Sequence, residues 1–240
     1  VSVAAFPIEA LTPFALALWG VGALASLALL ALRQRRFVAA LGRLHERREL
    51  GRGVYGAETS AAGPAVIGAL RARIVAPADF DARYNADEQR LVLAHERAHV
   101  EQCDPLINAV AAVIQCVSWF NPAAHIGAKA LREDQELACD ERVLANASGA
   151  RRAYAEALLK THIAHNSVPI GCAWPPANLK AIKERIAMLK RNAPSRTRLT
   201  LGVGSVLLAT ASACAVAWAA QPPRVVLKHD TPSPLLGAIE

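Results

Sequence analysis

The sequence predicts a mainly α-helical integral membrane protein, in which two transmembrane helices flank a helical domain with a small β-hairpin. Two uncharged stretches, residues 11–32 and 199–220, are each long enough for a span of about 20 apolar residues. Hydrophobic residues make up 53% of the 240, and the excess over a soluble domain lies in these two blocks. Between the blocks, apolar residues recur at helical spacing over several segments.

Charges beside the two spans predict their orientation. Three arginines follow the first span, and four basic residues come shortly before the second. They are Arg33, Arg35 and Arg36, and then Lys190, Arg191, Arg196 and Arg198. Only Arg224 and Lys228 argue for the opposite orientation. Short loops rich in Lys and Arg stay in the cytoplasm, so the segment between the spans is expected inside the cell and both ends outside.

These observations divide the chain into four predicted parts. Residues 1–32 form an N-terminal segment with a transmembrane helix, and residues 33–198 form a cytoplasmic domain. Residues 199–220 form a second transmembrane helix, and residues 221–240 form an extracytoplasmic tail. The net charge of +7 is then mostly a property of the membrane-proximal clusters. No basic stripe with interleaved aromatic residues is present, which argues against direct binding of nucleic acid.

The first part of the domain is expected to contain a helix, a loop and a hairpin. Residues 33–54 are basic with a helical apolar face, which predicts a helix on the membrane surface or a solvated continuation of the first span. The glycines of residues 51–64 predict a flexible loop. Residues 65–76 hold two short apolar runs about Gly68 and predict a hairpin. Its edge is either purely structural or an exposed edge on which a peptide could pair as an added strand.

The second part of the domain is predicted to be helical. Asn85 followed by Glu88 predicts a helix start, and this helix should end near Asp104. Residues 105–120 are uncharged but short for a span, so they predict a buried or membrane-dipping helix that ends at Asn121. Further helices are expected at residues 123–147, 151–165 and 179–191.

The predicted helix from Asn85 contains a His-Glu-x-x-His pattern, formed by His95, Glu96 and His99. Residues four apart on a helix share one face, about 6 Å apart along the axis. The two imidazoles can therefore aim at one point, as a tetrahedral zinc ion requires. Glu96 is placed to act as the catalytic base toward a water at that ion. The pattern predicts Zn²⁺ as cofactor; the alternative is two surface histidines on an amphipathic helix.

A catalytic zinc site takes three protein ligands and leaves a fourth position for water. The helix expected at 123–147 offers Glu133, Glu136 and Asp140 on roughly one face. One carboxylate could bind the metal while another holds a ligand histidine through its free ring N–H. Spacing alone leaves the choice among the three open. Cys139 should face about 100° away from Asp140, so it is discounted as a fourth ligand.

Several motifs together carry a resemblance to a known family. They are His95-Glu96-Arg97-Ala98-His99, Asp104, Trp119-Phe120-Asn121-Pro122 and Glu136-Leu137-Ala138-Cys139-Asp140. Over about residues 60–190 the chain resembles the cytoplasmic protease domain of the BlaR/MecR-type membrane metallopeptidases, the beta-lactam-sensing antirepressor family. The Glu-x-x-x-Asp pattern is also similar to the wider gluzincin group. The resemblance implies Glu136 as the third ligand, Asp140 as the partner of a ligand histidine and Glu96 as general base.

The resemblance also implies an activity and a location. We expect a zinc metalloendopeptidase of the inner (cytoplasmic) membrane that cleaves itself or a cytoplasmic regulator such as a transcriptional repressor. The expected partners are such a protein or peptide substrate and the lipid bilayer. Beta-lactam sensing and antibiotic resistance are implied by the resemblance alone. In the family a sensor domain follows the last span, whereas about twenty residues follow Ala220 here.

Two other functions compete with this one. The first is a membrane quality-control protease of the gluzincin type, and the second is a non-catalytic signal transducer that zinc stabilises. His125 and Tyr154 are further candidates as oxyanion donors, although packing is the favoured role for both.

Overall fold

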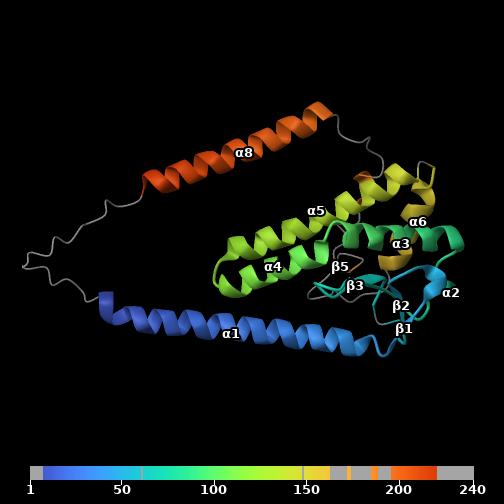
Figure 1. Cartoon of the computed structure of the whole chain (residues 1–240), viewed down its shortest axis with the longest axis horizontal. Coiled ribbons are helices and arrows are strands. Elements are labelled where there is room, and N and C mark those ends of the chain that lie inside the picture. Colours follow the sequence, from blue (N-terminus) through green and yellow to red (C-terminus); the bar gives the residue numbers. More distant parts are fainter. Residues whose placement is uncertain are drawn as a thin grey trace, which may run out of the picture. The chain divides into compact units, whose positions relative to one another are not determined.

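The structure is a computed structural model that describes residues 8–60, 62–147, 149–162, 172–173, 185–188 and 196–220 (Figure 1). The chain divides into two compact units, Val1–Asn192 and Ala193–Glu240. The first unit contains α1 (Ile8–Ala40), β1 (Leu44–Glu46), the 3-10 helix η1 (Arg48–Leu50), β2 (Val54–Ala57), β3 (Ala65–Ile67), β4 (Arg73–Ala76), α2 (Phe80–Arg83), α3 (Ala86–Glu101), α4 (Asp104–Val117), α5 (Pro122–Asn146), α6 (Arg151–His162) and β5 (Cys172–Ala173). The second contains α8 (Arg196–Ala219).

Both predicted spans lie within long helices. Leu11–Ala40 of α1 and Thr200–Ala219 of α8 are long and apolar enough to cross a membrane, by length and composition. Arg33, Arg35 and Arg36 continue α1 beyond the apolar part, so the predicted first span and residues 33–40 belong to one helix. The division of the chain into 1–32, 33–198, 199–220 and 221–240 stays a prediction, and the tail lies outside the described residues.

The helix predicted to continue as far as residue 54 is wrong beyond Ala40. Gly42 has φ +72°, a conformation that ends helices, and the chain then forms β1 and η1. The apolar side chains at the end of α1 explain the change. Phe37 and Leu41 are buried against Ile67 and Val75 of the sheet rather than lying on a membrane surface. The loop predicted for residues 51–64 is likewise interrupted by β2.

The predicted hairpin is present as β3 and β4, which pair antiparallel with Val66 opposite Ile74. It forms part of a five-stranded sheet of order β1-β2-β4-β3-β5 rather than an isolated pair. β2 runs parallel to β4 and antiparallel to β1. The edge of β3 is also not free, because Ala65 and Val66 pair with Ala173 and Cys172 of β5. The expectation of an exposed edge on β3 is therefore wrong.

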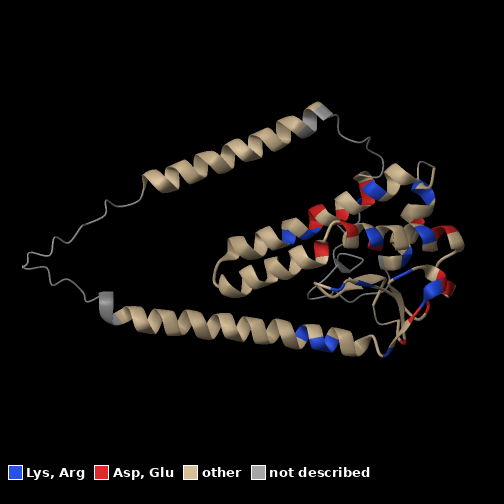
Figure 2. Cartoon of the chain, in the orientation of Figure 1, with Lys and Arg blue, Asp and Glu red and all other residues tan. Residues whose placement is uncertain are grey.

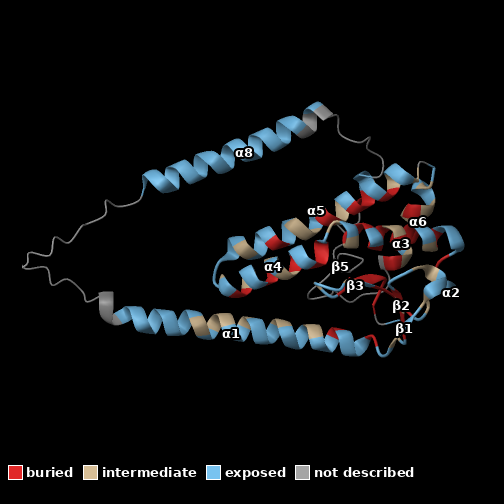
Figure 3. Cartoon of the chain, viewed as in Figure 1, coloured by how far each residue is buried: buried red, intermediate tan, exposed pale blue. Residues whose placement is uncertain are grey.

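The largest core cluster joins this sheet to the helices. Val54, Val66 and Ile74 from the sheet pack with Val92 of α3 and Leu158 of α6, and all five are buried. Figure 3 shows buried residues concentrated on the sheet and α3, while the visible surface of α1 is mostly exposed. The sheet thus supports the helix that carries the His-Glu-x-x-His pattern.

The start of α3 is as the sequence predicts. The Asn85 side chain accepts hydrogen bonds from the backbone N–H groups of Asp87 and Glu88, and the Glu88 carboxylate accepts one from the Asn85 N–H. This capping box satisfies donors that the first turn leaves free. The buried Glu88 carboxylate also accepts two bonds from Lys160 of α6, each 2.7 Å long. The capping box thus defines the start of α3, and the Lys160 bonds tie that start to α6.

α4 and α5 form a helical hairpin that packs against α1 through its tip. The Trp19 indole N–H donates to the Val117 carbonyl at 2.9 Å, and the Trp119 indole N–H donates to the Trp19 carbonyl at 3.2 Å. The Trp119 ring lies directly on Gly22, where a methyl group would overlap it. The predicted helix at 105–120 is α4, and the one at 123–147 is α5. Of the helix predicted at 179–191, residues 185–188 are described and are helical.

Replacing Gly22 with Ala should therefore destabilise the protein. Overpacking typically costs about 1–3 kcal/mol, and here the new methyl group would displace Trp119 from α1. Gly20→Ala is the matched control, since nothing lies within 4 Å of a Cβ at that position of the same helix. Thermal unfolding in detergent micelles should show a lower Tm for Gly22→Ala than for Gly20→Ala. Equal Tm values would contradict the packing described here.

Candidate metal centre

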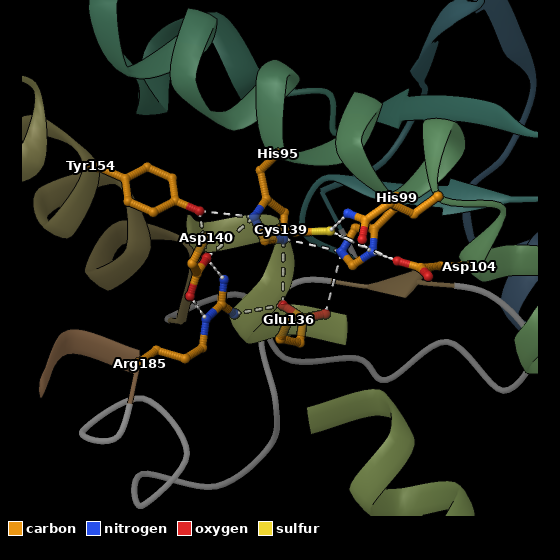
Figure 4. A network of polar contacts seen from close by, with 9 residues as sticks. His95, His99, Asp104, Glu136, Cys139, Asp140, Tyr154 and Arg185 are labelled. Atoms are coloured by element: carbon orange, nitrogen blue, oxygen red, sulfur yellow. Dashed lines mark hydrogen bonds and ion pairs between the residues drawn. The ribbon is translucent and has the colours of Figure 1, made fainter. Parts of the chain in front are cut away.

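α3 carries three of the predicted site residues on its buried side. His95, Glu96 and His99 are at most 1% exposed. The two histidines are one turn apart, and their Nε2 atoms lie 3.1 Å from each other (Figure 4). Arg97 points away from this face, and its guanidinium donates to the Leu50 carbonyl.

α5 crosses α3 and brings Glu136 to the same point. Its Oε2 atom lies 3.4 Å from Nε2 of His95, and its Oε1 atom lies 3.5 Å from Nε2 of His99. Glu133, which the spacing had also allowed, lies elsewhere on α5, where it is exposed and pairs with Lys129. The structure thus brings His95, His99 and Glu136 together, with all three ligand atoms within 4.8 Å of one another.

Asp140 and Tyr154 lie behind His95. The Tyr154 hydroxyl donates to Asp140 Oδ1 at 2.5 Å and lies 2.8 Å from Nδ1 of His95. Asp140 Oδ1 itself is 3.3 Å from that nitrogen. Because the hydroxyl proton is directed at the carboxylate, the Nδ1–H of His95 is the donor toward this pair. Burial and the adjacent Asp140 carboxylate raise the pKa of the Tyr154 hydroxyl well above its ordinary value, so Tyr154 stays protonated.

Asp104 and Cys139 lie behind His99. Asp104 Oδ2 is 2.7 Å from Nδ1 of His99, and Cys139 Sγ is 3.3 Å from the same nitrogen. Asp104 comes from the first turn of α4, which Cys103 places by adopting a left-handed conformation with φ 59°. Cys139 faces the nitrogen of His99 opposite to the one near Glu136, consistent with its exclusion as a fourth ligand at that point. The sequence had indicated Asp104 as a helix end and as part of the resemblance, but not as the partner of His99.

This arrangement fits a metal ion. With each Nδ1 directed at a carboxylate, each Nε2 presents a lone pair toward the other histidine and toward Glu136. The two Nε2 atoms and the Glu136 carboxylate are all electron-rich and converge on one point, where a cation would bind favourably. A tetrahedral ion with bonds of about 2.0–2.1 Å holds its ligand atoms about 3.3 Å apart. The two Nε2 atoms lie 3.1 Å apart, and each lies 3.4 or 3.5 Å from one of the two oxygens of the Glu136 carboxylate, which is close to that spacing.

Glu96 lies beside the candidate metal centre, and its hydrogen bonding and pKa differ from those of the other carboxylates there. Both of its oxygens are buried, and neither has a hydrogen-bond partner among the described residues. Burial, only partly offset by the neighbouring histidines, raises the pKa of Glu96 to about 7. A carboxyl group with such a pKa can both accept and release a proton near neutral pH.

Arg185 completes the centre and was not singled out from the sequence. Its side chain is 2% exposed and lies 2.8 Å from Glu136 Oε2 and 2.7 Å from each oxygen of Asp140. Burial alone would raise the pKa of Asp140, but the Arg185 charge and hydrogen bonds hold it at about 2. The same charge keeps the pKa of Glu136 well below its ordinary value despite burial. Both carboxylates are therefore ionised.

One sequence candidate lies outside the centre. His125 is at the tip of the α4–α5 hairpin, where its ring Nε2 donates to the Trp119 carbonyl at 3.1 Å. Eleven residues of helix separate it from Glu136, which is about 16 Å along the axis. An oxyanion role for His125 is therefore wrong. Tyr154 is in the centre, but its contacts are with Asp140 and His95.

Comparison with known proteins agrees with the family resemblance that the sequence motifs indicate. The family model described as BlaR1 peptidase M56 matches residues 2–189. The chain is 31% identical over 160 residues to the "Regulatory protein BlaR1" of Bacillus licheniformis, which is 62% of this chain and 26% of that protein. It is 33% identical over 81 residues to the "Methicillin resistance mecR1 protein" of Staphylococcus aureus, which is 34% of this chain and 14% of that protein.

The Staphylococcus epidermidis protein with the same name gives the same figures as the Staphylococcus aureus one. The chain thus spans well under half the length of these relatives. The resemblance predicted from the motifs is confirmed, because the family model covers most of the chain. The chain belongs to the BlaR1 peptidase M56 family.

Proposed function

We propose that the chain is a membrane-embedded zinc metalloendopeptidase of the antirepressor, signal-transducing type. It hydrolyses peptide bonds in itself or in a cytoplasmic regulator such as a repressor. The observation that carries the proposal is the convergence of the His95, His99 and Glu136 ligand atoms beside the buried carboxylate of Glu96, which has no hydrogen-bond partner among the described residues. The names of the relatives, a regulatory protein and a methicillin resistance protein, support the signalling role.

In this proposal each residue has a defined role. His95, His99 and Glu136 hold the zinc ion, which when bound polarises a peptide carbonyl and acidifies water. Asp140 with Tyr154 fixes the ring of His95, and Asp104 fixes the ring of His99. Glu96 takes a proton from the attacking water and delivers it to the leaving amine nitrogen.

The proposed location follows from the two apolar helices and the flanking charges. α1 and α8 cross the inner membrane, and the metal centre faces the cytoplasm, where a repressor would be available. A purely structural zinc is less well supported. Structural sites are normally closed by four protein ligands, whereas the described residues direct three ligand atoms to this point.

The proposal is tested with the purified full chain in detergent micelles. Metal analysis should find one zinc per chain. The wild-type chain should cleave a tagged Glu96→Gln copy of itself, or an unfolded test protein such as fluorescent casein. A chelator should stop this cleavage, and added zinc should restore it. Absence of bound zinc, or cleavage that a chelator leaves unchanged, would overturn the proposal.

The carboxylate behind His99 should tune the affinity for zinc. Asp104→Asn keeps the shape of the side chain but removes the charge that orients Nδ1 of His99. Loss of such a partner typically weakens metal affinity about 10–100-fold. Competition with a chromogenic chelator measures the change. Asp134→Asn is the control, because Asp134 is an exposed residue of the same helix as Glu136. Equal zinc affinities of the two variants would contradict this role of Asp104.

A further inference from the structure

We propose that the α4–α5 hairpin inserts into the membrane from the cytoplasmic side beside α1 as a re-entrant element, with lipid acyl chains covering its outer face. The inference rests on the proposed membrane-spanning role of α1. It does not depend on the metal centre or on its chemistry.

The hairpin has the composition of a membrane segment. Between Asp104 and Lys129 the chain carries no charged side chain, and Figure 2 shows the tip half of the hairpin without acidic or basic residues. Large apolar side chains on α4 are 40–55% exposed: Leu106, Ile107, Val110, Val113, Ile114 and Val117. At the tip, Phe120 is 63% and Ile126 is 69% exposed. So large an apolar surface is unusual for a protein face in water.

The exposed apolar residues of α4 form one continuous stripe. They recur at intervals of three and four residues, which is the spacing of one helix face. The opposite face is buried in the protein, at positions such as Ala112 and Cys116. For a soluble protein, the amphipathic arrangement of α4 is therefore inverted. Its apolar stripe points outward, and its opposite face packs against the rest of the protein.

Contacts with α1 place the hairpin tip at the depth of the proposed span. Trp19 of α1 donates to the Val117 carbonyl, and Gly22 lies under the Trp119 ring. Trp19 precedes Arg33, the first basic residue after the apolar part of α1, by 14 residues, or about 21 Å of helix. The hydrocarbon core is about 30 Å thick. If α1 crosses that core, the tip that contacts Trp19 is inside it.

The length of the hairpin fits an element that enters and returns. α4 has 14 residues, or about 21 Å, which is too short to cross the core. On α5 the first charged residue is Lys129, about 10 Å from the start of the helix at Pro122. A lysine at that depth can extend its ammonium group toward the headgroups. Both helices therefore lead back to the side from which they entered.

The turn at the tip has its backbone carbonyls paired within the protein. The carbonyls of Val117, Ser118 and Trp119 accept bonds from the Trp19 indole, the Asn121 backbone N–H and the His125 ring. In water such carbonyls need no protein partner, whereas in hydrocarbon each unpaired group costs several kcal/mol. Two of the three donors are side chains, so this pairing is a property of the sequence and suits a turn placed in lipid.

The test is a depth measurement on the full chain in vesicles of phosphatidylethanolamine and phosphatidylglycerol. Single cysteines at positions 113 and 126 carry a nitroxide label, in a background where the native cysteines other than buried Cys139 are replaced by serine. The label at each site should be several-fold more accessible to oxygen than to a water-soluble nickel chelate. Leu70, 88% exposed in the turn after β3, is the aqueous control and should show the reverse preference.

Two results would overturn the inference. A preference for the nickel chelate at 113 and 126 would place the hairpin in water. Low access to both reagents would mean that protein, either another segment of this chain or a second copy, covers the stripe. Zinc content and cleavage are measured on the same variants. A water-exposed hairpin in a chain that binds zinc and cleaves its substrate would contradict this inference alone. An inserted hairpin in a chain without zinc would contradict only the proposed function.

Discussion

The Glu96→Gln variant should retain zinc and lose peptide-bond cleavage. Both oxygens of Glu96 are buried without a hydrogen-bond partner among the described residues, so the side chain is available to a water at the metal centre. The amide of Gln cannot accept and release a proton near neutral pH. Removing a general acid–base group typically lowers the rate about 100-fold to 10,000-fold. Single-turnover cleavage of a tagged copy of the chain measures the loss.

Glu101→Gln is the matched control for this variant. Glu101 lies on the same helix, but it is exposed and pairs with Arg142 on the surface. It should leave the rate unchanged. Glu96→Gln should also be at least as stable as the wild-type chain without metal, because it no longer buries an unpartnered carboxyl group. Near-normal cleavage by Glu96→Gln would remove Glu96 from the mechanism.

The Arg185→Met variant should lose much of the stability of the fold. Arg185 is the buried cation that lies against both Glu136 and Asp140. Methionine fills similar space but leaves the buried Asp140 carboxylate and the mostly buried Glu136 carboxylate without their counter-charge. Removing one partner of a buried ion pair costs about 3–5 kcal/mol. Denaturant unfolding in micelles, in the presence of a chelator, measures the change.

Zinc should reduce this loss, because a bound cation would compensate part of the charge of Glu136. We therefore expect a smaller penalty for Arg185→Met in the zinc-loaded chain than in the chelated one. Arg142→Met is the control, since Arg142 makes an exposed ion pair, and such pairs contribute about 0–1 kcal/mol. Equal stabilities of the Arg185 and Arg142 variants would show that the buried network is not needed for folding.

Elements with local signals, namely the helices and the β3–β4 hairpin, were predictable from the sequence, whereas β1 and β2 were not. The capping box of Asn85 and Glu88 defines the start of α3 through contacts three residues apart. In contrast, β1 and β2 are strands of three and four residues. β2 forms because Val54 and Ala57 are buried by partners distant in sequence, and β1 forms by pairing with β2. The sequence did not indicate these strands, because the apolar residues of the basic run after the first span have helical spacing. In the structure these apolar residues are buried by the sheet.

The candidate site likewise contains residues that local spacing predicts and residues that only the tertiary packing places. His95, Glu96 and His99 form a local pattern on one helix, so their side of α3 follows from spacing. The choice of Glu136 over Glu133 depends on how α5 is rotated against α3, and spacing left it open. The position of Arg185 depends on a segment 45 residues beyond Asp140, with no pattern that links them. The Lys-Glu-Arg-Ile run in the predicted helix at 179–191 was the one available signal.

In the proposed protease, the pairing of β5 with β3 would have a consequence for substrate selection. β3 packs against α3 and accepts Cys172 and Ala173 as its outer neighbours. An extended polypeptide that adds to this edge must displace an intramolecular competitor. A tethered segment competes at an effective concentration on the order of millimolar. Dilute free peptides would thus be rejected, and a target held close by, in the same complex or on the same membrane, would be admitted.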